Sequence, residues 1–313
     1  MPFVSLGLSP ALARAAAALG LHQPTPIQSA AIPEVLRGGD VLGTAQTGSG
    51  KTAAFVLPLL QQLGDEPPQT PRRTRVLVLV PTRELATQVG ETVRALLPAL
   101  PRRLKAAIVF GGVSINPQML HLRGGAEIVV ATPGRLLDLI DHHAIRLDAV
   151  ATLVLDEADR LLDLGFAEEL ARILALLPAR RQNLFFSATF APAVQALAGQ
   201  LLREPVCIHI AAEPADRPDI TQRAIVVDPP RRTQLLRHLI AAHGWARALV
   251  FVATKYAAEQ VADKLRRAGL SAEPFHGQLS QGKRDQVLAD LKASRVQVVV
   301  STDLAGRGID IAQ

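Results

Sequence analysis

Short apolar runs alternate with amphipathic stretches along the first two-thirds of the chain. The apolar runs have the length and the Val, Ile and Leu content of buried parallel strands, and the stretches between them carry apolar residues at helical spacing. The predicted strands are Val41–Gly43, Val76–Val80, Ala106–Val109, Ile128–Val130, Thr152–Leu155, Leu184–Phe186 and Val206–Ile210, and the predicted helices are Thr52–Leu63, Arg83–Leu97, Gly134–Asp141, Phe166–Leu177 and Ala191–Leu202. This alternation predicts an α/β fold with a parallel sheet covered on both faces.

The pattern breaks in "REPVCIHIAAEPADRPDITQ", Arg203 to Gln222, which becomes rich in Pro and Asp and loses its periodicity. We therefore predict an N-terminal domain over residues 1–210, a linker over 211–220 and a second domain over 221–313. The alternation resumes in the second domain, with predicted strands at Arg223–Val227, Ala248–Val252, Ala272–Phe275 and Val296–Ser301 and predicted helices at Arg231–Ala242, Lys255–Ala268 and Ser280–Lys292.

Composition narrows the class of partner. The net charge of +6 favours a polyanion, nucleic acid before membrane, although ordinary solubilising charge is the simpler alternative. Aromatic residues make up only 4% of the chain, so stacking platforms for bases are not expected, and the nucleic-acid backbone would carry most of the contact. The absence of a long apolar run or a secretory signal pattern, together with the single cysteine Cys207, predicts a cytoplasmic protein with no membrane partner.

A phosphate-binding loop is indicated by "AQTGSGKT", Ala45 to Thr52, between the first strand and its helix. Small residues allow backbone N–H groups to converge on phosphate oxygens at the helix N-terminus. Lys51 would reach the β- and γ-phosphates, and the Thr52 hydroxyl would bind Mg²⁺. The general pattern has Gly where Ala45 stands, and the alternative interpretation is a loop with an incidental lysine. The loop residues predicted to bind the nucleotide are Ala45, Thr47, Gly48, Ser49, Gly50, Lys51 and Thr52.

A P-loop requires a carboxylate at the end of another buried strand, and "TLVLDEAD", Thr152 to Asp159, supplies one. Asp156 would bind the metal and Glu157 would polarise the attacking water, so Lys51, Asp156 and Glu157 are the predicted catalytic residues. Without the P-loop, the same acids would be interpreted as the N-cap of a helix.

Residues 156–159 spell DEAD, and with other segments the chain resembles the DEAD-box RNA helicases. "QPTPIQ" (Gln23 to Gln28) is similar to the adenine-reading Q motif, "PTRELA", "GG" and "TPGR" to motifs that face RNA, and "SAT" to the segment that couples hydrolysis to unwinding. "LVFVAT", "HGQLSQGKR" and "STDLAGRGID" are similar to motifs of the second domain. "FGGVSINPQM" and "ATPGRLLDL" resemble the bacterial RhlE-type branch.

The resemblance implies two P-loop domains of the RecA-like type, with ATP and Mg²⁺ between them and RNA as the partner. It also implies ribosome-assembly or RNA-degradation proteins as further partners. The implied adenosine contacts are Phe3, Gln23, Gln28 and Asp303. The implied RNA contacts are Thr82, Arg83, Gly112, Thr132, Arg135, Thr254, Arg284 and Thr302. The implied coupling residues are Asp159, Ser187, Thr189 and Arg307.

Each assignment has a plainer alternative. Phe3 alone would be a core residue, and Gln28 would belong to a turn that leads into a helix. The threonines, and Ser187 with Thr189, would cap helices, and the arginines would lie on solvated faces. The clusters "PRR" at 71–73 and 101–103 are most simply solvated loops.

The family's second domain continues beyond the point that corresponds to Gln313, into an HRxGRxGR motif whose arginines reach the γ-phosphate. The resemblance therefore implies a second domain truncated before that motif, with an incomplete sheet, an exposed apolar patch and weak activity. Two further hypotheses are an ATP-gated RNA clamp with little turnover and a P-loop ATPase that acts on DNA.

Overall fold

A computed structural model describes residues 2–46, 48–67, 69–210 and 221–302 of the chain. The chain divides into two compact units, Met1–Arg217 and Pro218–Gln313, and each is described by itself. The predicted linker at 211–220 lies outside the described residues.

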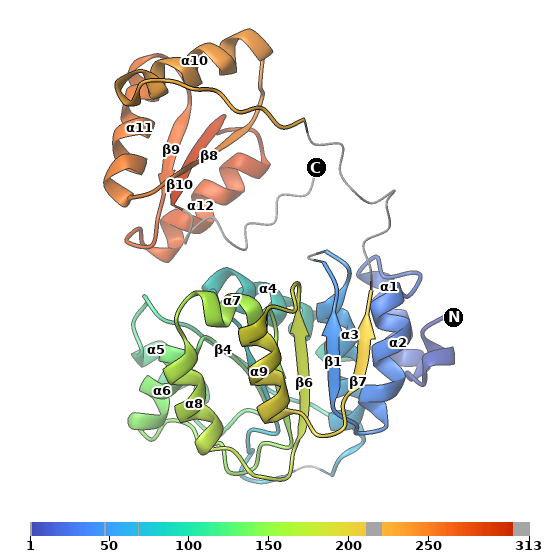
Figure 1. Ribbon diagram of the computed structural model, residues 1–313. Helices are drawn as coiled ribbons and strands as arrows, with labels where there is room; N and C mark the ends of the chain where they lie inside the picture. The colour runs from blue at the N-terminus through green and yellow to red at the C-terminus, as the bar shows by residue number, and fades with distance from the viewer. Residues whose placement is uncertain (1, 47, 68, 211–220, 303–313) are drawn as a thin grey trace. The chain divides into compact units, whose positions relative to one another are not determined.

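The first unit is built on a parallel sheet of seven strands in the order β3-β4-β2-β5-β6-β1-β7 (Figure 1). The described pairings are all parallel, so the strands share one carboxyl edge and one amino edge. The strands are β1 (Val41–Thr44), β2 (Val76–Leu79), β3 (Ala106–Val109), β4 (Ile128–Ala131), β5 (Thr152–Leu155), β6 (Gln182–Ser187) and β7 (Val206–His209). The α/β class and the parallel sheet predicted from the sequence are confirmed.

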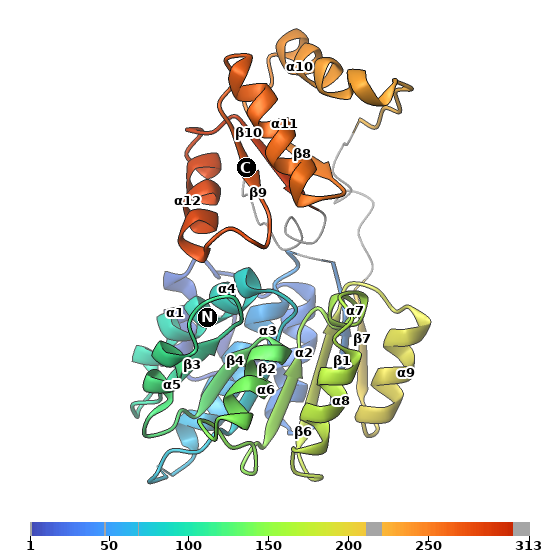
Figure 2. The ribbon, with the colours of Figure 1, turned by 90° about the vertical axis from the view of Figure 1, so that its left-hand side faces the viewer.

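Helices cover both faces of this sheet (Figures 1 and 2). Successive strand residues point to opposite faces, so Val78 packs into one core while Leu77 and Leu79 pack into the other. The first core contains helices α1 (Pro10–Ala18), α2 (Pro26–Leu36), α3 (Lys51–Asp65) and α4 (Arg83–Leu96). The second contains α5 (Asn116–Leu122), α6 (Pro133–Asp141), α7 (Ala158–Asp163), α8 (Ala167–Ala175) and α9 (Pro192–Leu201).

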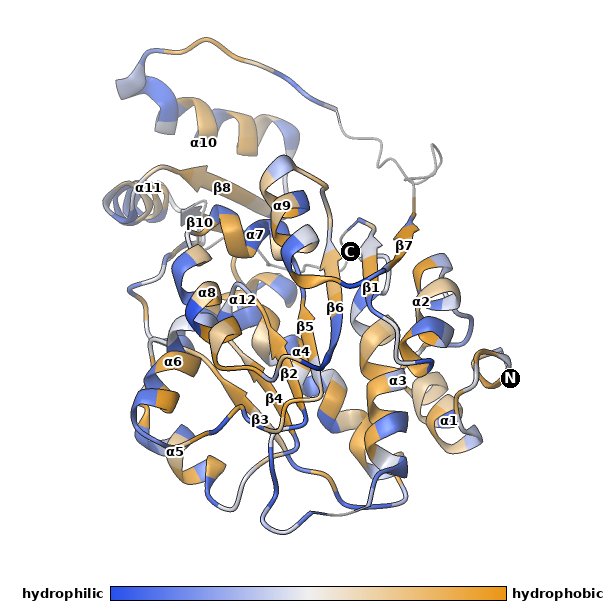
Figure 3. Cartoon of the chain, turned by 60° about the horizontal axis from the view of Figure 1, so that its bottom comes forward, coloured by the Kyte–Doolittle hydropathy of each residue, from blue (hydrophilic) through white to orange (hydrophobic). Residues whose placement is uncertain are grey.

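The second unit has a three-stranded parallel sheet in the order β8-β10-β9. Its strands are β8 (Ala248–Val252), β9 (Ala272–Phe275) and β10 (Val298–Thr302), and its helices are α10 (Arg232–His243), α11 (Lys255–Arg267) and α12 (Gln281–Lys292). Strand β8 is hydrophobic throughout (Figure 3), yet Leu249 and Phe251 are exposed, 38% and 53% respectively. One face of this edge strand is therefore uncovered within the second unit.

One predicted strand is wrong, and the list of predicted helices is incomplete. The predicted strand Arg223–Val227 does not form: these residues are described but belong to no strand, and Val226 is fully exposed. The segment pairs with neither edge strand of the second unit's sheet, and β-propensity alone does not create a strand. Helices α1, α2, α5 and α7 are not among the helices predicted from periodicity. Helix α1 is rich in alanine, α2 contains two prolines, and α5 and α7 have only seven and six residues, so none of them gives a strong periodic signal.

Candidate functional site

The polar residues of the candidate site follow the strands at the carboxyl edge of the first sheet. Ala45 to Gly50 connect β1 to α3, and Asp156 directly follows β5. Strands β1 and β5 both flank β6, so the two segments meet at the same edge. Thr47 lies outside the described residues.

The loop before α3 has the geometry of a phosphate cradle. Gly50 adopts a φ of 90°, and a Cβ atom there would collide with the amide of Gln28, so only glycine fits. The Ser49 hydroxyl is buried and has no hydrogen-bond partner among the described residues. Helix α3 begins at Lys51, so its unpaired backbone N–H groups open into the cradle.

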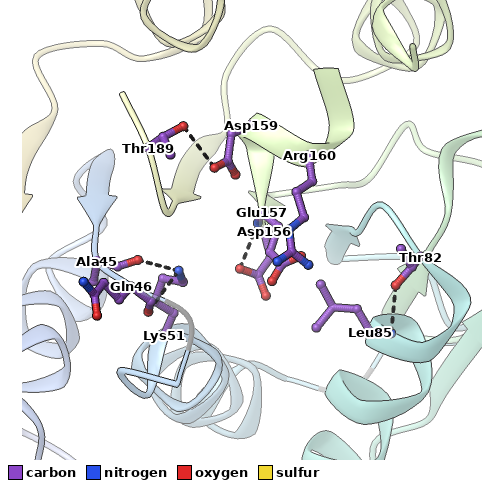
Figure 4. A network of polar contacts seen from close by, with 10 residues as sticks. All are labelled: Ala45, Gln46, Lys51, Thr82, Leu85, Asp156, Glu157, Asp159, Arg160 and Thr189. Atoms are coloured by element: carbon purple, nitrogen blue, oxygen red, sulfur yellow. Dashed lines mark hydrogen bonds and ion pairs between the residues drawn. The ribbon is translucent and has the colours of Figure 1, made fainter. Parts of the chain in front are cut away.

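Lys51 is held against the backbone of this loop (Figure 4). Its Nζ donates to the carbonyl of Ala45 at 2.6 Å and to that of Gln46 at 3.3 Å. Burial lowers the pKa of Lys51, and the carboxylates of Asp156, Glu157 and Asp159 partly oppose that shift. A polyanion such as a nucleotide phosphate would compensate the buried ammonium far better than carbonyl groups do.

Asp156 and Glu157 stand beside Lys51 at the end of β5 (Figure 4). Burial and the neighbouring Glu157 raise the pKa of Asp156 to about 7. One Asp156 oxygen accepts the Glu157 backbone N–H at 3.0 Å. Glu157 occupies the N-cap position of helix α7, as the alternative interpretation proposed for these acids, but its side chain makes no capping bond.

Glu157 adopts a left-handed conformation, with φ 52° and ψ 52°. A non-glycine residue rarely accepts this conformation, and such strain gathers at functional sites. Its carboxylate pairs with Arg160 at 2.9 Å, while burial raises its pKa. Arg160 was not among the predicted site residues. The only signal for it in the sequence is its spacing three residues after Glu157 on a helix.

The donor set at this edge fits Mg²⁺. Burial raises the pKa of Asp156 although Lys51 lies nearby, so the lysine compensates this carboxylate only in part, and magnesium prefers one or two carboxylates together with phosphate and hydroxyl oxygens. Asp156 supplies the carboxylate, and Thr52, in the first turn of α3, supplies a hydroxyl from the facing segment. When bound, the ion would neutralise phosphate charge.

Asp159 connects two strand ends. The Thr189 hydroxyl donates to Asp159 at 3.0 Å (Figure 4). The Thr189 backbone N–H donates to the fully buried Ser187 hydroxyl at 3.4 Å. Helix α9 takes Ala191 as its N-cap without a side-chain bond. The alternative in which Ser187 and Thr189 cap this helix is therefore wrong, and the structure joins Thr189 to Asp159.

The residues predicted to read adenine lie at different depths. Gln28 is fully buried and its amide is engaged within the protein: it donates to the Gly50 carbonyl and accepts from the Thr25 N–H, both at 3.0 Å. Gln28 thereby holds the phosphate cradle to the start of α2. Phe3 is 2% exposed within the first core, as its plainer alternative proposed, and Gln23 is exposed.

The predicted RNA contacts of the first unit come together beyond β2, β3 and β4. Arg83 lies against Gly112, where a Cβ atom would collide with its guanidinium group. Thr82 caps α4 by accepting the Leu85 N–H at 3.2 Å, whereas Thr132 precedes α6 without a capping bond. Arg135 is buried and donates to the Val113 carbonyl at 2.8 Å, so the solvated-face alternative is wrong for it.

Comparison with known proteins identifies the arrangement. Residues 25–197 match the model of the DEAD/DEAH box helicase family, and residues 231–313 match that of the helicase conserved C-terminal domain. The chain belongs to the DEAD/DEAH box helicase family.

Curated helicases match almost the whole chain. The ATP-dependent RNA helicase DeaD of Escherichia coli K12 is 40% identical over 309 residues, which cover 99% of this chain and 48% of DeaD. The DEAD-box ATP-dependent RNA helicase CshA of Bacillus cereus is 39% identical over 310 residues, which cover 99% of this chain and 58% of CshA. The chain thus spans about half the length of the curated relatives it matches.

Solved helicase structures share the fold. A DEAD box protein from the hyperthermophile Methanococcus jannaschii aligns with a TM-score of 0.62 at 33% identity, over 100% of this chain and 83% of that one. Dbp5 of S. cerevisiae, solved bound to RNA and ADP BeF3, aligns with a TM-score of 0.81 at 29% identity, over 99% and 78% of the two chains. These neighbours support RecA-like units.

Three of the predicted helicase residues in the second unit are described. Thr254 caps α11 by accepting the Ala257 N–H at 3.1 Å, and Thr302 is the last residue of β10. Arg284 is buried, with its guanidinium 5.0 Å from the centre of the Phe275 ring. Asp303 and Arg307 lie outside the described residues. Within the described part of the chain, no helix is long and apolar enough to cross a membrane.

Proposed function

We propose that this chain is an RNA-dependent ATPase that separates short RNA duplexes, with ATP and Mg²⁺ bound at the carboxyl edge of the first sheet. The observation that carries the proposal is that buried Lys51 lies beside Asp156 and Glu157 at the end of the phosphate loop. In this loop only glycine fits at position 50. Family membership and the names of the relatives support RNA as the substrate.

The residues divide the work by their chemistry. Lys51 would exchange its two carbonyl acceptors for phosphate oxygens. Asp156 and Thr52 would hold the metal. Glu157, with its carboxylate held by Arg160, would orient the attacking water and accept its proton. Arg83 and Arg135, together with Thr82 and Thr132, would contact the RNA backbone, which fits the low aromatic content of the chain.

The test of the proposal is the rate of phosphate release by the 313-residue chain, with and without saturating single-stranded RNA. We expect RNA to stimulate hydrolysis and DNA of the same sequence not to do so. Stimulation by DNA alone would favour a DNA-dependent ATPase. ATP-dependent RNA binding without any stimulated release would favour the clamp and contradict the enzymatic proposal.

The hydrogen bond between Asp159 and Thr189 is proposed to couple hydrolysis to unwinding. Thr189→Val keeps the shape of the side chain but removes its donor, which leaves Asp159 without its one described hydrogen bond. We expect duplex unwinding to fall by roughly tenfold, the equivalent of about 1.4 kcal/mol for one charge-assisted hydrogen bond. RNA-stimulated ATPase activity should change far less, and an equal loss of both activities would contradict the coupling role.

A further inference from the structure

A basic surface lies at the amino edge of the first sheet, away from the nucleotide site at the carboxyl edge. The loops that enter β2, β3, β4 and β5 meet there, at the ends opposite the strand arrowheads in Figure 1. A cavity of about 700 Å³ opens between them, and an adjoining one of about 410 Å³ shares Pro71, Arg72 and Gly124 with it. We call these two hollows the amino-edge cradle.

The cradle carries a surplus of positive charge. Among the described residues that line it are six arginines, two histidines and two carboxylates; the arginines are Arg72, Arg73, Arg102, Arg103, Arg123 and Arg146. Glu127 is shared between Arg72 at 3.3 Å and Arg102 at 3.9 Å. Asp148 is shared between Arg73 at 3.6 Å and Arg146 at 2.8 Å. Each carboxylate therefore neutralises only one of the two arginines that it holds in place.

The fold builds this surface. Gly125 has a φ of 79°, and a Cβ atom there would collide with the carbonyl of Arg72, so the two loops pack backbone to backbone. The buried Glu127 also accepts the Lys105 N–H at 2.9 Å, and Arg102 donates to the Leu63 carbonyl at 2.9 Å. The "PRR" clusters are thus not independent solvated loops, because the sheet brings both of them to one edge beside Arg123 and Arg146.

The cradle is separate from the nucleotide site. Strands β2, β3, β4 and β5 each have four residues, and at about 3.3 Å per residue their two edges are on the order of 13 Å apart. Thr82, Gly112, Thr132 and Asp156 follow the carboxyl ends of these strands, whereas the cradle arginines precede the amino ends. One short strand of RNA cannot lie on both edges without passing around the sheet.

We infer that the amino-edge cradle binds the sugar–phosphate backbone of RNA that flanks the segment held at the carboxyl edge, and so tethers the enzyme to longer substrates. The guanidinium group of arginine can form two parallel hydrogen bonds with a phosphate group. Two adjoining cavities can accommodate successive phosphates of a polymer, whereas a single anion would need only one of them. The cradle has no Tyr, Trp or Phe among the described residues of its lining, so it would bind RNA without regard to sequence. This inference rests on the proposed function, because it takes RNA as the substrate.

The test uses two triple variants of the whole chain. The cradle variant carries Arg73→Gln, Arg123→Gln and Arg146→Gln, and keeps Arg72 and Arg102 to compensate the buried Glu127. The control variant carries Arg14→Gln, Arg94→Gln and Arg172→Gln, which are exposed arginines outside the cradle lining, and it changes the net charge equally. Fluorescence anisotropy measures the binding of two single-stranded RNAs. The long RNA has about 30 nucleotides, and the short RNA has about 8, too few to span both edges of the sheet.

Without nucleotide, we expect the cradle variant to bind the long RNA roughly tenfold more weakly, with a salt slope lower by about 2, as befits three lost phosphate contacts. The control variant should resemble the wild-type chain. ATP-dependent binding of the short RNA should be the same in all three proteins. If the wild-type chain does not bind the short RNA in the presence of ATP, the proposed function is refuted. The binding of long RNA without nucleotide tests the amino-edge cradle independently of that result.

Equal binding of long RNA by the cradle and control variants would overturn the inference. So would a cradle variant that keeps RNA affinity but loses binding to a poly-glutamate peptide, since the surface would then serve an acidic protein segment. Should the triple variant fold poorly, as judged by circular dichroism, the single change Arg123→Gln at an exposed position is compared with Arg94→Gln. The salt slope of long-RNA binding should then be lower by about 0.7 for Arg123→Gln than for Arg94→Gln, as expected for one lost phosphate contact, and equal slopes would overturn the inference.

Discussion

Replacing Glu157 by glutamine is expected to lower the RNA-stimulated rate of ATP hydrolysis by roughly 10²- to 10⁴-fold, the usual contribution of a general base. The amide keeps the volume of the side chain but cannot accept a proton from the attacking water. Glu157 is well prepared for this role, because burial raises its pKa while Arg160 fixes its orientation at 2.9 Å. The measurement is steady-state phosphate release at saturating ATP and RNA.

Nucleotide affinity should separate this role from a structural one. Since Glu157 acts on water rather than on the phosphates, the affinity for a non-hydrolysable ATP analogue should change by less than about threefold, below 1 kcal/mol. The exposed Glu168→Gln on α8 is the matched control and should hydrolyse ATP at the wild-type rate. A Glu157→Gln variant that hydrolyses ATP within tenfold of wild type would remove Glu157 from the chemistry.

The sequence predicts elements well where an apolar run is buried on both faces. Strand β5 and helix α4 form close to their expected bounds because Val and Leu recur there at the period that the packing requires. The pattern fails where tertiary context decides. Residues 224–227 are apolar and three of them are β-branched, yet a strand also depends on pairing with a sheet edge, which the local sequence does not encode.

In the candidate site, too, some features are predictable from the sequence and others depend on tertiary structure. Lys51, Asp156 and Glu157 are foreseeable because strand, glycine loop and acid occur in a fixed order. Three features are not: the left-handed backbone of Glu157, the ion pair with Arg160, and the use of the Gln28 amide against Gly50. Each depends on atoms that come together only in three dimensions.

The amino-edge cradle cannot be predicted from the sequence, for a related reason. Its arginines come from four separate loops, and each loop alone looks like an ordinary solvated turn. Only the parallel topology places the loops before β2, β3, β4 and β5 on one edge.

Asp156→Asn is expected to stabilise the nucleotide-free protein at pH 8 by roughly 2–4 kcal/mol. Burial raises the pKa of Asp156 from 3.8 to about 7, so the folded state favours the protonated form. A rise of that size in the pKa corresponds to about 4 kcal/mol of folding free energy at most. Wild-type stability should therefore fall as the pH rises from about 4 to about 7, whereas the neutral asparagine avoids this penalty. Urea unfolding of both proteins at pH 4 and pH 8 measures the difference.

The effect of Asp156→Asn on stability should change sign when ATP and Mg²⁺ are bound. A carboxylate that is costly when buried alone becomes favourable beside a divalent cation, so ATP with Mg²⁺ should stabilise the wild-type protein and scarcely affect Asp156→Asn. The exposed Asp163→Asn is the control and should leave the pH dependence unchanged. An equal effect of Asp156→Asn at pH 4 and pH 8 would show that Asp156 is not destabilised by burial. The expected pattern, in contrast, means that the fold tolerates a destabilising carboxylate at the end of β5 because nucleotide binding requires its charge there.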